Sequence, residues 1–374
     1  MKNLTWVEIS KDALSENIKQ FRRLVGDKIL CSCVKANAYG HGLVEAASVF
    51  LAAGADWLSV SALYEAASLR AAGVNAPIYV LGYVAIADLA EAVELDVRLV
   101  IYNKETIVEL GSIGKPVKIH LKVETGNNRQ GILIDDLIDF ADFTRSFANI
   151  EIEGIATHFA NIEDTTDHSY AEQQLARFND AHRRLESAGF KVPIRHCANS
   201  AATILFPETH FEMMRTGIAN YGMWPSNETY VSYLKEIGDG FKLEPAFTWK
   251  ARIAQIKKIP SGEYIGYGCT YRSTHETRLA IIPIGYYDGY DRGVSNMAYV
   301  LINGKRAPLR GRVCMNIIMA DVTDIPEAKL EEEVVLIGRD GEEIISAEQF
   351  AGWAGTINYE VTTRVNERIP RILI

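Results

Sequence analysis

The sequence predicts an α/β protein in which a (β/α)8 barrel is followed by a mostly-β C-terminal domain. Three observations support this fold class. Short β-rich runs alternate with amphipathic helical stretches over about 230 residues. Many of the runs are almost continuously apolar, as strands buried on both faces are. After about Lys242 helical periodicity nearly disappears, and glycine or Asn-Gly turns separate β-rich segments.

Eight strands and the helices between them are expected in the barrel. Eight alternating units in about 230 residues suit a (β/α)8 barrel, which typically needs ~250 residues, although a doubly wound sheet alternates in the same way. The helical stretches include Leu43–Ala53, Leu63–Ala72, Asp135–Phe147 and Ala171–Ala188. The expected strands are Ile29–Lys35, Trp57–Ser61, Ile78–Gly82, Arg98–Tyr102, Val117–Val123, Ile152–His158, Ile194–Cys197 and Met213–Gly217.

The rest of the chain is expected to form a second, β-rich domain. Thr5–Ile9 alternates like a strand and could pair with either domain. The expected division is an N-terminal strand in residues 1–9 that joins the C-terminal domain, a barrel in residues 10–241 and a β-rich domain in residues 242–374. The predicted elements of that domain are the β-rich runs Ala246–Ile259, Glu263–Cys269, Leu279–Gly285, Ala298–Ile302 and Val334–Ile337, and a helix at Ser346–Trp353.

The amino-acid composition limits which binding partners and which cellular compartment are expected. Lysine and arginine number 39 and aspartate and glutamate 48, so the formal net charge is −9, which argues against nucleic acid as the main partner. Five scattered cysteines do not form a disulfide framework and indicate a reducing compartment. The longest uncharged stretch, Ala71–Ala87, contains Asn75 and Pro77 and does not suit a membrane span. We therefore expect a cytoplasmic protein.

Polar residues follow five of the predicted barrel strands. In a barrel the carboxyl ends of all strands meet on one face, where barrel enzymes have their active sites. A lysine amine there can act as a nucleophile, and amides that precede helical segments suit a phosphate. Each residue alone has a structural explanation, such as a histidine satisfied in the core, but together they favour a site. The residues are Lys35, Lys122, Arg129, His158, Ser200, Arg215, Gly217 and Ile218.

These segments resemble the alanine racemase family of pyridoxal-phosphate (PLP) enzymes. The resemblance begins with Val34–Gly42 and continues in the second domain, at Ile265–Gly268, Ile282–Gly289, Gly311–Met315 and Gly355–Glu360. It implies an isomerase that interconverts L-alanine and D-alanine and supplies D-alanine for peptidoglycan. It also implies a homodimer whose active sites lie at the subunit interface.

The resemblance also implies roles toward the cofactor. Lys35 would hold PLP as a Schiff base, and His158 would lie against its ring. Arg215 would face the pyridine nitrogen. A guanidinium stays protonated, so this nitrogen would remain neutral and side reactions such as transamination would be restrained. The cofactor phosphate would be bound by Tyr39, Ser200, the amides of Gly217 and Ile218, and Tyr359.

Racemisation needs one proton-transfer group on each face of the α-carbon. The resemblance implies that Lys35 is one and that Tyr267 of the partner subunit is the other. Arg129 and the Met315 amide would bind the substrate carboxylate, and Tyr359 beside the substrate would favour a small side chain. Lys122 would be carbamylated (N6-carboxylysine) and would orient Arg129.

Four positions depart from the common family pattern. Glu124, Asn316 and Glu163 replace aspartates, and Asn127 replaces a methionine. These changes leave the proton chemistry intact but keep a broader racemase, acting on serine or lysine, open. The entrance to the site would be lined by Glu163, Tyr286, Arg292 and Arg312.

Three other functions would each require features that the sequence lacks or carries only in part. A PLP barrel decarboxylase would have glutamate where Arg215 stands and a catalytic cysteine, for which only Cys269 is near Tyr267. A PLP-carrying barrel without activity would lack the second domain. A metal-dependent hydrolase would need clustered histidines, whereas the eight histidines contain no His-x-His or His-Glu-x-x-His pair. No metal is expected.

Overall fold

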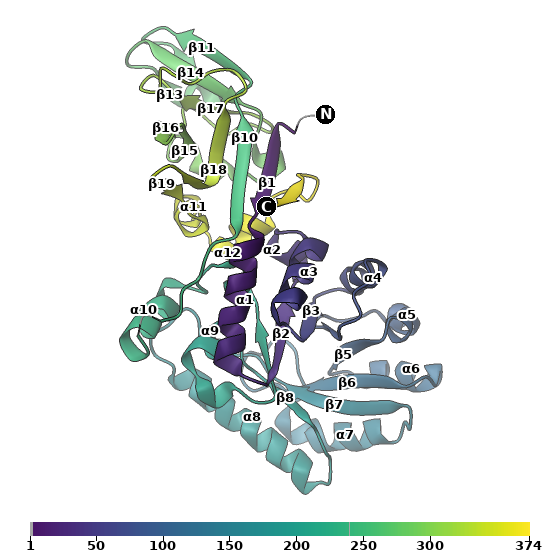
Figure 1. The fold of residues 1–374 in the computed structure, drawn as a ribbon. Helices are drawn as coiled ribbons and strands as arrows, with labels where there is room; N and C mark the ends of the chain where they lie inside the picture. Colours follow the sequence, from purple (N-terminus) through teal and green to yellow (C-terminus); the bar gives the residue numbers. More distant parts are fainter. Residues whose placement is uncertain (1–2, 239) are drawn as a thin grey trace. The chain divides into compact units, whose positions relative to one another are not determined.

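The computed structural model describes residues 3–238 and 240–374, so residues 1–2 and 239 of the expected domains lie outside the described residues. The chain divides into two compact units (Figure 1). The barrel unit comprises Asp12–Ala38 and Leu43–Pro245. The second unit comprises Met1–Lys11, Tyr39–Gly42 and Ala246–Ile374. Within the described residues no helix combines the length and the apolar character that crossing a membrane requires.

The barrel unit is built on a parallel sheet of eight strands, as predicted. Its order, β8-β7-β6-β5-β4-β3-β2-β9, brings the first and last barrel strands together. The Arg215 amide donates to the Ala198 carbonyl at 3.0 Å across the remaining gap, so the barrel is nearly closed. The strands are β2 (Ile29–Cys33), β3 (Trp57–Val60), β4 (Ile78–Val80), β5 (Val97–Ile101), β6 (Val117–Lys122), β7 (Ile150–Ala156), β8 (Ile194–His196) and β9 (Met213–Thr216).

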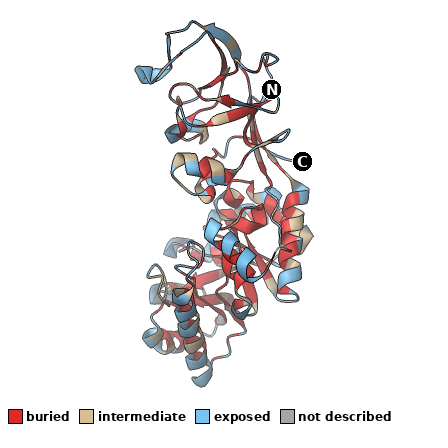
Figure 2. Cartoon of the chain, turned by 90° about the vertical axis from the view of Figure 1, so that its left-hand side faces the viewer, coloured by how far each residue is buried: buried red, intermediate tan, exposed pale blue. Residues whose placement is uncertain are grey.

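Helices cover the outside of this sheet. Their apolar faces pack inward, and the exposed residues of Figure 2 lie on their outer faces. Most predicted strands end one or two residues late, because their last residues already belong to the loops that follow. The helices are α1 (Lys11–Val25), α3 (Leu43–Ala53), α4 (Leu63–Ala71), α5 (Leu89–Glu94), α6 (Lys104–Ile113), α7 (Leu137–Arg145), α8 (Ser169–Ser187), α9 (Ser200–Leu205) and α10 (Asn227–Glu236).

Side chains from alternate strand positions fill the barrel interior. Each large apolar side chain buried here contributes about 1.5–3 kcal/mol. This apolar layer is therefore a packed core and not an open channel through the barrel. It is formed by Cys31, Trp57, Tyr79, Val100, Ile194 and Met213.

The segment labelled α2 (Lys35–Tyr39) directly after β2 is a left-handed turn. Ala36, Asn37 and Ala38 all have φ of 53° and ψ of 46–53°, and Tyr39 also has φ of 53°. Left-handed helical backbone costs an L-residue about 1–2 kcal/mol. Specific contacts must therefore hold this turn.

The second unit is mostly β, as predicted. A seven-stranded sheet has the order β16-β15-β18-β10-β1-β20, with β19 paired to β18, and a three-stranded sheet has the order β11-β14-β17. Its elements are β1 (Thr5–Ile9), β10 (Phe247–Arg252), β11 (Gln255–Ile259), β12 (Tyr264–Ile265), β13 (Tyr271–Arg272), β14 (Thr277–Ile282), β15 (Tyr299–Ile302), β16 (Lys305–Pro308), β17 (Ile318–Asp321), β18 (Glu333–Asp340), β19 (Glu343–Ile345), β20 (Arg371–Leu373), α11 (Ala347–Ala354) and α12 (Asn358–Thr363).

Two of the predicted β-rich runs differ in detail. Ala246–Ile259 is β-rich, as predicted, but it forms two strands, β10 and β11, which belong to different sheets, and the chain turns a corner between them. Glu263–Cys269 is extended only at β12, because the glycines at positions 266 and 268 have φ of 76° and 72° and start a tight turn. Asn303 and Gly304, with φ of 52° and 71°, form the predicted hairpin turn between β15 and β16.

An irregularity in β7 shapes the barrel interior. The pairing of β6 with β7 runs from Ile119 opposite Ile152 to His120 opposite Gly154, so Glu153 is an extra residue on β7. Such a bulge redirects a side chain, and it brings Glu153 beside His120. Gly154 makes room for the histidine, because a Cβ at this glycine would lie 2.4 Å from His120 Nδ1.

Gly154→Ala should therefore destabilise the barrel. The added methyl group would push the His120 ring away, and such overpacking costs about 1–3 kcal/mol. Urea unfolding of the variant measures this loss. Gly352→Ala is the matched control, since a Cβ there meets no atom within 4 Å. Equal unfolding midpoints for both variants would contradict the argument.

Candidate active site

The structure brings five of the predicted site residues together at the carboxyl end of the barrel. His158, which follows β7, is half-buried. Burial lowers the pKa of His158 well below its usual range, and the charges of Lys122, Arg215, Arg129 and Lys35 lower it further. The imidazole is therefore neutral, and the basic side chains of four residues lie within electrostatic reach of it. Such a cluster suits an anionic ligand.

A second group of predicted site residues at the carboxyl end of the barrel consists of Ser200, Gly217 and Ile218. Ser200 begins α9, and its Oγ accepts a hydrogen bond from the Gly217 amide at 2.8 Å. Ile218 begins a short 3₁₀-helix after β9. These residues follow the last two barrel strands, where barrel enzymes bind phosphate groups. A hydroxyl and two neighbouring amides fit the phosphate of PLP.

Arg215 is buried at the end of β9. Its Nη2 donates to the Thr157 carbonyl at 3.0 Å, and its Nη1 donates to the His196 carbonyl at 3.1 Å and to His196 Nδ1. All of these acceptors are neutral. The guanidinium is thereby fixed in position while its charge is left uncompensated at the site.

A buried polar row, Arg215–His196–His120–Glu153, continues from this guanidinium into the barrel. His196 Nε2 lies 2.6 Å from His120 Nδ1, and His120 Nε2 lies 3.2 Å from Glu153 Oε2. Burial lowers the pKa of both histidines, and the charge of Arg215 adds to this. Each neutral imidazole therefore accepts at Nδ1 and donates from Nε2–H, so every hydrogen bond in the row points from Arg215 toward Glu153.

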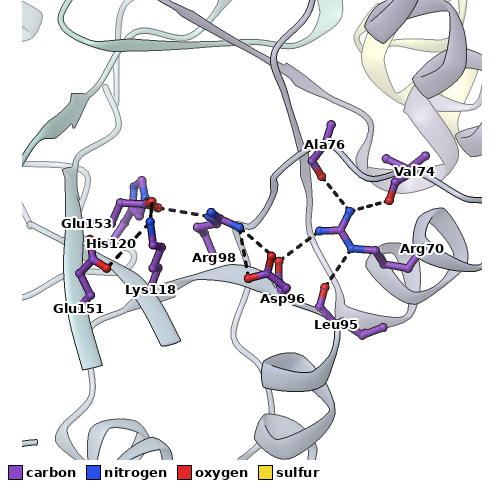
Figure 3. Close-up of polar contacts among 10 residues, drawn as sticks. All are labelled: Arg70, Val74, Ala76, Leu95, Asp96, Arg98, Lys118, His120, Glu151 and Glu153. Carbon is purple, nitrogen blue, oxygen red and sulfur yellow. Dashed lines mark hydrogen bonds and ion pairs between the residues drawn. The ribbon is translucent and has the colours of Figure 1, made fainter. Parts of the chain in front are cut away.

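Glu153 ends the buried polar row among cations (Figure 3). Lys118 Nζ donates to Oε1 at 3.0 Å and Arg98 Nε to Oε2 at 3.3 Å. Burial raises the pKa of this carboxyl, but hydrogen bonds from His120 and Lys118 outweigh it and bring the pKa to about 2. Arg98 in turn lies 3.5 Å from an Asp96 carboxylate oxygen, and Arg70 donates to the Asp96 carbonyl at 3.1 Å. The row is thus anchored to the outer loops of the barrel.

Lys122 and Arg129 lie on β6 and the loop after it. Burial lowers the pKa of Lys122 well below its usual range, and the charges of Arg215 and Arg129 lower it further. A neutral amine is the form that reacts with carbon dioxide. Glu124 accepts from the amides of residues 126–129, which outweighs burial and lowers its pKa. The glutamate thus shapes the loop that carries Arg129.

The other three residues that differ from the common family pattern also make hydrogen bonds to their neighbours. Asn127 Nδ2 donates to the Phe159 carbonyl at 3.3 Å and to the His158 carbonyl at 3.4 Å. Glu163 Oε1 accepts from Asn199 Nδ2 at 2.6 Å, next to Ser200. Asn316, in the second unit, donates a hydrogen bond to Asp288.

The second unit carries the other predicted residues. The rings of Tyr39 and Tyr359 lie 6.0 Å apart. Tyr267 stands between two glycines and is 73% exposed. Arg312 lies against the same turn, because a Cβ at Gly268 would be 2.8 Å from Arg312 Nη1.

Met315, Tyr286 and Arg292 lie on neighbouring loops of this unit. Met315 is exposed, and its carbonyl accepts from the Tyr287 amide at 3.0 Å. Tyr286 and Arg292 line a cavity of about 540 Å³. Its other lining residues are Tyr287, Gly289, Asp291, Arg364 and Asn366.

His120, His196 and Glu153 were not predicted as site residues. His120 stands two residues before Lys122, so alternation alone would put both side chains on the inner face of the barrel. His196 is the last residue of β8 and Arg215 is the penultimate residue of β9, the two strands that face each other across the remaining gap of the barrel. Strand alternation does not identify Glu153 as an inward-facing residue, because only the bulge in β7 turns its side chain inward.

The buried polar row predicts a pH-dependent stability. The pKa of Glu153 in the fold, about 2, lies below its usual 4.5. Its stabilisation is therefore present above about pH 4.5 and disappears as the pH falls toward 2. Glu153→Gln should cost about 1–3 kcal/mol in unfolding free energy near pH 7, and much less near pH 3. Chemical unfolding at both pH values measures this, with exposed Glu151→Gln as control; a constant difference would contradict it.

Comparison with known proteins identifies relatives over nearly the whole chain. The alanine racemase N-terminal domain family matches residues 9–225 and the C-terminal domain family matches residues 246–373. The chain is 43% identical to alanine racemase of Desulforamulus reducens over the full length of both chains. It is 40% identical to that of Methanococcus maripaludis over 99% of this chain and 98% of the relative.

Solved structures extend the likeness to the fold. Alanine racemase of Bacillus anthracis with bound L-Ala-P is 38% identical, with a TM-score of 0.93 over 100% of this chain and 96% of that one. The enzyme of Streptomyces lavendulae is 33% identical, with a TM-score of 0.91 over 100% and 98%. Both parts of the sequence, the complete fold and the cationic carboxyl end of the barrel lead to one conclusion: this chain belongs to the alanine racemase family.

Proposed function

We propose that this protein interconverts L-alanine and D-alanine with PLP held on Lys35. One observation carries the proposal. At the carboxyl end of the barrel, Lys35 and Arg215 both lie within electrostatic reach of His158, and the buried Arg215 is hydrogen-bonded to neutral acceptors. When bound, PLP withdraws electrons from the Cα–H bond of an amino acid attached to it. Ser200 and the Gly217 and Ile218 amides are proposed to bind its phosphate, together with Tyr39 and Tyr359.

The protein supplies the proton transfers. Lys35 Nζ serves one face of the α-carbon and Tyr267 Oη the other. As the Cα–H bond breaks on one face, one of these groups takes the proton and the electron pair stays with the substrate. The other group then delivers a proton to the opposite face. The number of protons is conserved, and no other reactant is needed.

The buried polar row supports the choice of reaction. Arg215 is fixed by neutral acceptors, and a guanidinium does not give up its proton, so Arg215 would leave the cofactor's ring nitrogen unprotonated. His158 is neutral and can lie against the ring. This restrains transamination while still permitting proton removal. Arg129 and the Met315 amide are proposed to bind the substrate carboxylate, and Tyr359 to favour a methyl side chain.

We propose a homodimer in which each active site takes Tyr267 of the partner subunit. The exposure of this tyrosine in the single chain, 73%, supports that role. Glu163, Tyr286, Arg292 and Arg312 are proposed to line the entrance. Cytoplasmic D-alanine for peptidoglycan is the proposed biological product.

A substrate panel in deuterated water tests the function. Alanine should invert and gain α-deuterium well above other amino acids. A preference for serine or lysine would mean that alanine is not the main substrate. Release of carbon dioxide would indicate a decarboxylase instead of a racemase. Borohydride treatment should add the cofactor mass to the Lys35 peptide, and its failure to do so would overturn the proposal.

Tyr267→Phe should affect the two directions of racemisation unequally. A group that serves one face limits proton removal from one enantiomer, so deuterium washout should slow at least 100-fold for one and much less for the other, the usual range for acid–base groups being about 10²–10⁴-fold. Similar mild effects on both enantiomers would exclude Tyr267 as the second base.

Mixed dimers test the origin of Tyr267. Lys35→Ala and Tyr267→Phe homodimers should each be nearly inactive. If the tyrosine crosses the interface, co-assembly of the two variants creates one complete site per mixed dimer and restores activity. Persistent inactivity of purified mixed dimers would mean that both groups come from one chain.

Lys122 is proposed to be carbamylated. Native mass spectrometry and ¹³C NMR with labelled bicarbonate should detect one carbamate, which is absent from Lys122→Met. The variant should raise KM for alanine more than it lowers kcat, since the carbamate acts by orienting Arg129. An unmodified lysine in the fully active enzyme would contradict this role.

A further inference from the structure

The strained turn after Lys35 is held by a carboxylate from another part of the barrel. Glu65, on the first turn of α4, is buried. Its Oε1 accepts from the Ala36 amide at 2.6 Å, and its Oε2 accepts from the Ser61 and Ala62 amides at 2.8 and 3.0 Å. One side chain thereby joins the ends of β2 and β3.

A capping role explains only part of this geometry. Glu65 is the third residue of α4, and its bonds to Ser61 and Ala62 are those of a residue that caps its own helix. The bond to Ala36 spans 29 residues and reaches the first left-handed position, directly after Lys35. Helix capping does not require it.

The other contacts of this segment act on either side of Ala36. Tyr221 Oη donates to the Cys33 carbonyl at 2.8 Å, and the Val34 amide donates to the Ser59 carbonyl at 2.8 Å. Asn37 Oδ1 accepts from the Leu43 amide at 2.8 Å. Glu65 therefore provides the contact from another element at the residue where the backbone turns left-handed.

We infer that Glu65 is a positioning residue for Lys35: it holds the left-handed turn so that the amine is presented to the cofactor. The inference rests on the proposed function. A charged acceptor suits this place, because its two oxygens satisfy three amide donors and the resulting bonds are stronger than neutral ones. Without the bond to Ala36, the turn loses an interaction that offsets its backbone strain.

Glu65→Gln isolates this bond. The single oxygen of glutamine can keep either the two α4 amides or Ala36, and two bonds outweigh one, so the NH₂ group should face Ala36. Helix α4 should remain capped. Glu65→Asp is a second variant that keeps the charge: the shorter carboxylate can serve α4 but cannot also reach Ala36.

The measurements use the full-length chain. In the cofactor-free protein, hydrogen–deuterium exchange should accelerate in the Lys35 peptide but not in the α4 peptide. Spectrophotometric titration with PLP should show about 10-fold weaker binding for both variants, as expected for the loss of one hydrogen bond to a charged group. Glu45→Gln, an exposed change of the same kind on α3, should match the wild type.

Ala36→Gly provides the decisive comparison. Glycine adopts left-handed backbone without strain, and exposed Ala36 has little packing to lose. Adding Ala36→Gly to Glu65→Gln should recover much of the PLP affinity if Glu65 acts through the turn. Variants that bind PLP like the wild type, or a loss that glycine does not rescue, would overturn the inference. If the wild type itself fails to bind PLP on Lys35, the proposed function fails instead.

Discussion

A buried guanidinium bonded to neutral acceptors is the interaction on which the barrel interior depends. Removing a cation from water is costly unless other groups replace its hydration. Arg215 obtains this from two carbonyls and one imidazole nitrogen. The two imidazoles carry their N–H groups toward Glu153, so their dipoles stabilise the cation at one end and the anion at the other. The charge is thus tolerated without an adjacent carboxylate.

Stabilising Arg215 through two neutral histidines places requirements on the surrounding strands. The two histidines must lie on the inner face, Gly154 must lack a side chain, and β7 must contain an extra residue to turn Glu153 inward. A carboxylate bonded directly to Arg215 would stabilise the cation more simply. It would also remove the uncompensated charge that the proposed chemistry uses. The buried polar row therefore stabilises the barrel interior, and it also leaves at the carboxyl end the charge on which the proposed reaction depends.

The features that could be predicted from the sequence are those that leave a periodic pattern or lie at the end of a strand. The barrel strands and the cationic groups after them follow from apolar runs with polar residues at one end. The corner between β10 and β11 falls inside one predicted β-rich run, because its residues are as β-prone as those on either side. The turn at Ala36–Ala38 was missed because alanine rarely adopts left-handed backbone, and only contacts from distant residues such as Glu65 hold it there. Tyr267 came from family resemblance alone, since nothing local distinguishes it from other tyrosines.

The pairing of β1 bears on how the polypeptide folds as it is made. Residues 5–9 pair with β10 and β20, and Thr5 bonds to a residue 245 positions later. A ribosome therefore releases this apolar strand long before its partners exist, and the entire barrel is synthesised in the interval. An unpaired strand edge invites association with other chains. The second unit is completed only when β20 emerges, so folding of this unit cannot proceed strictly from the first residue to the last.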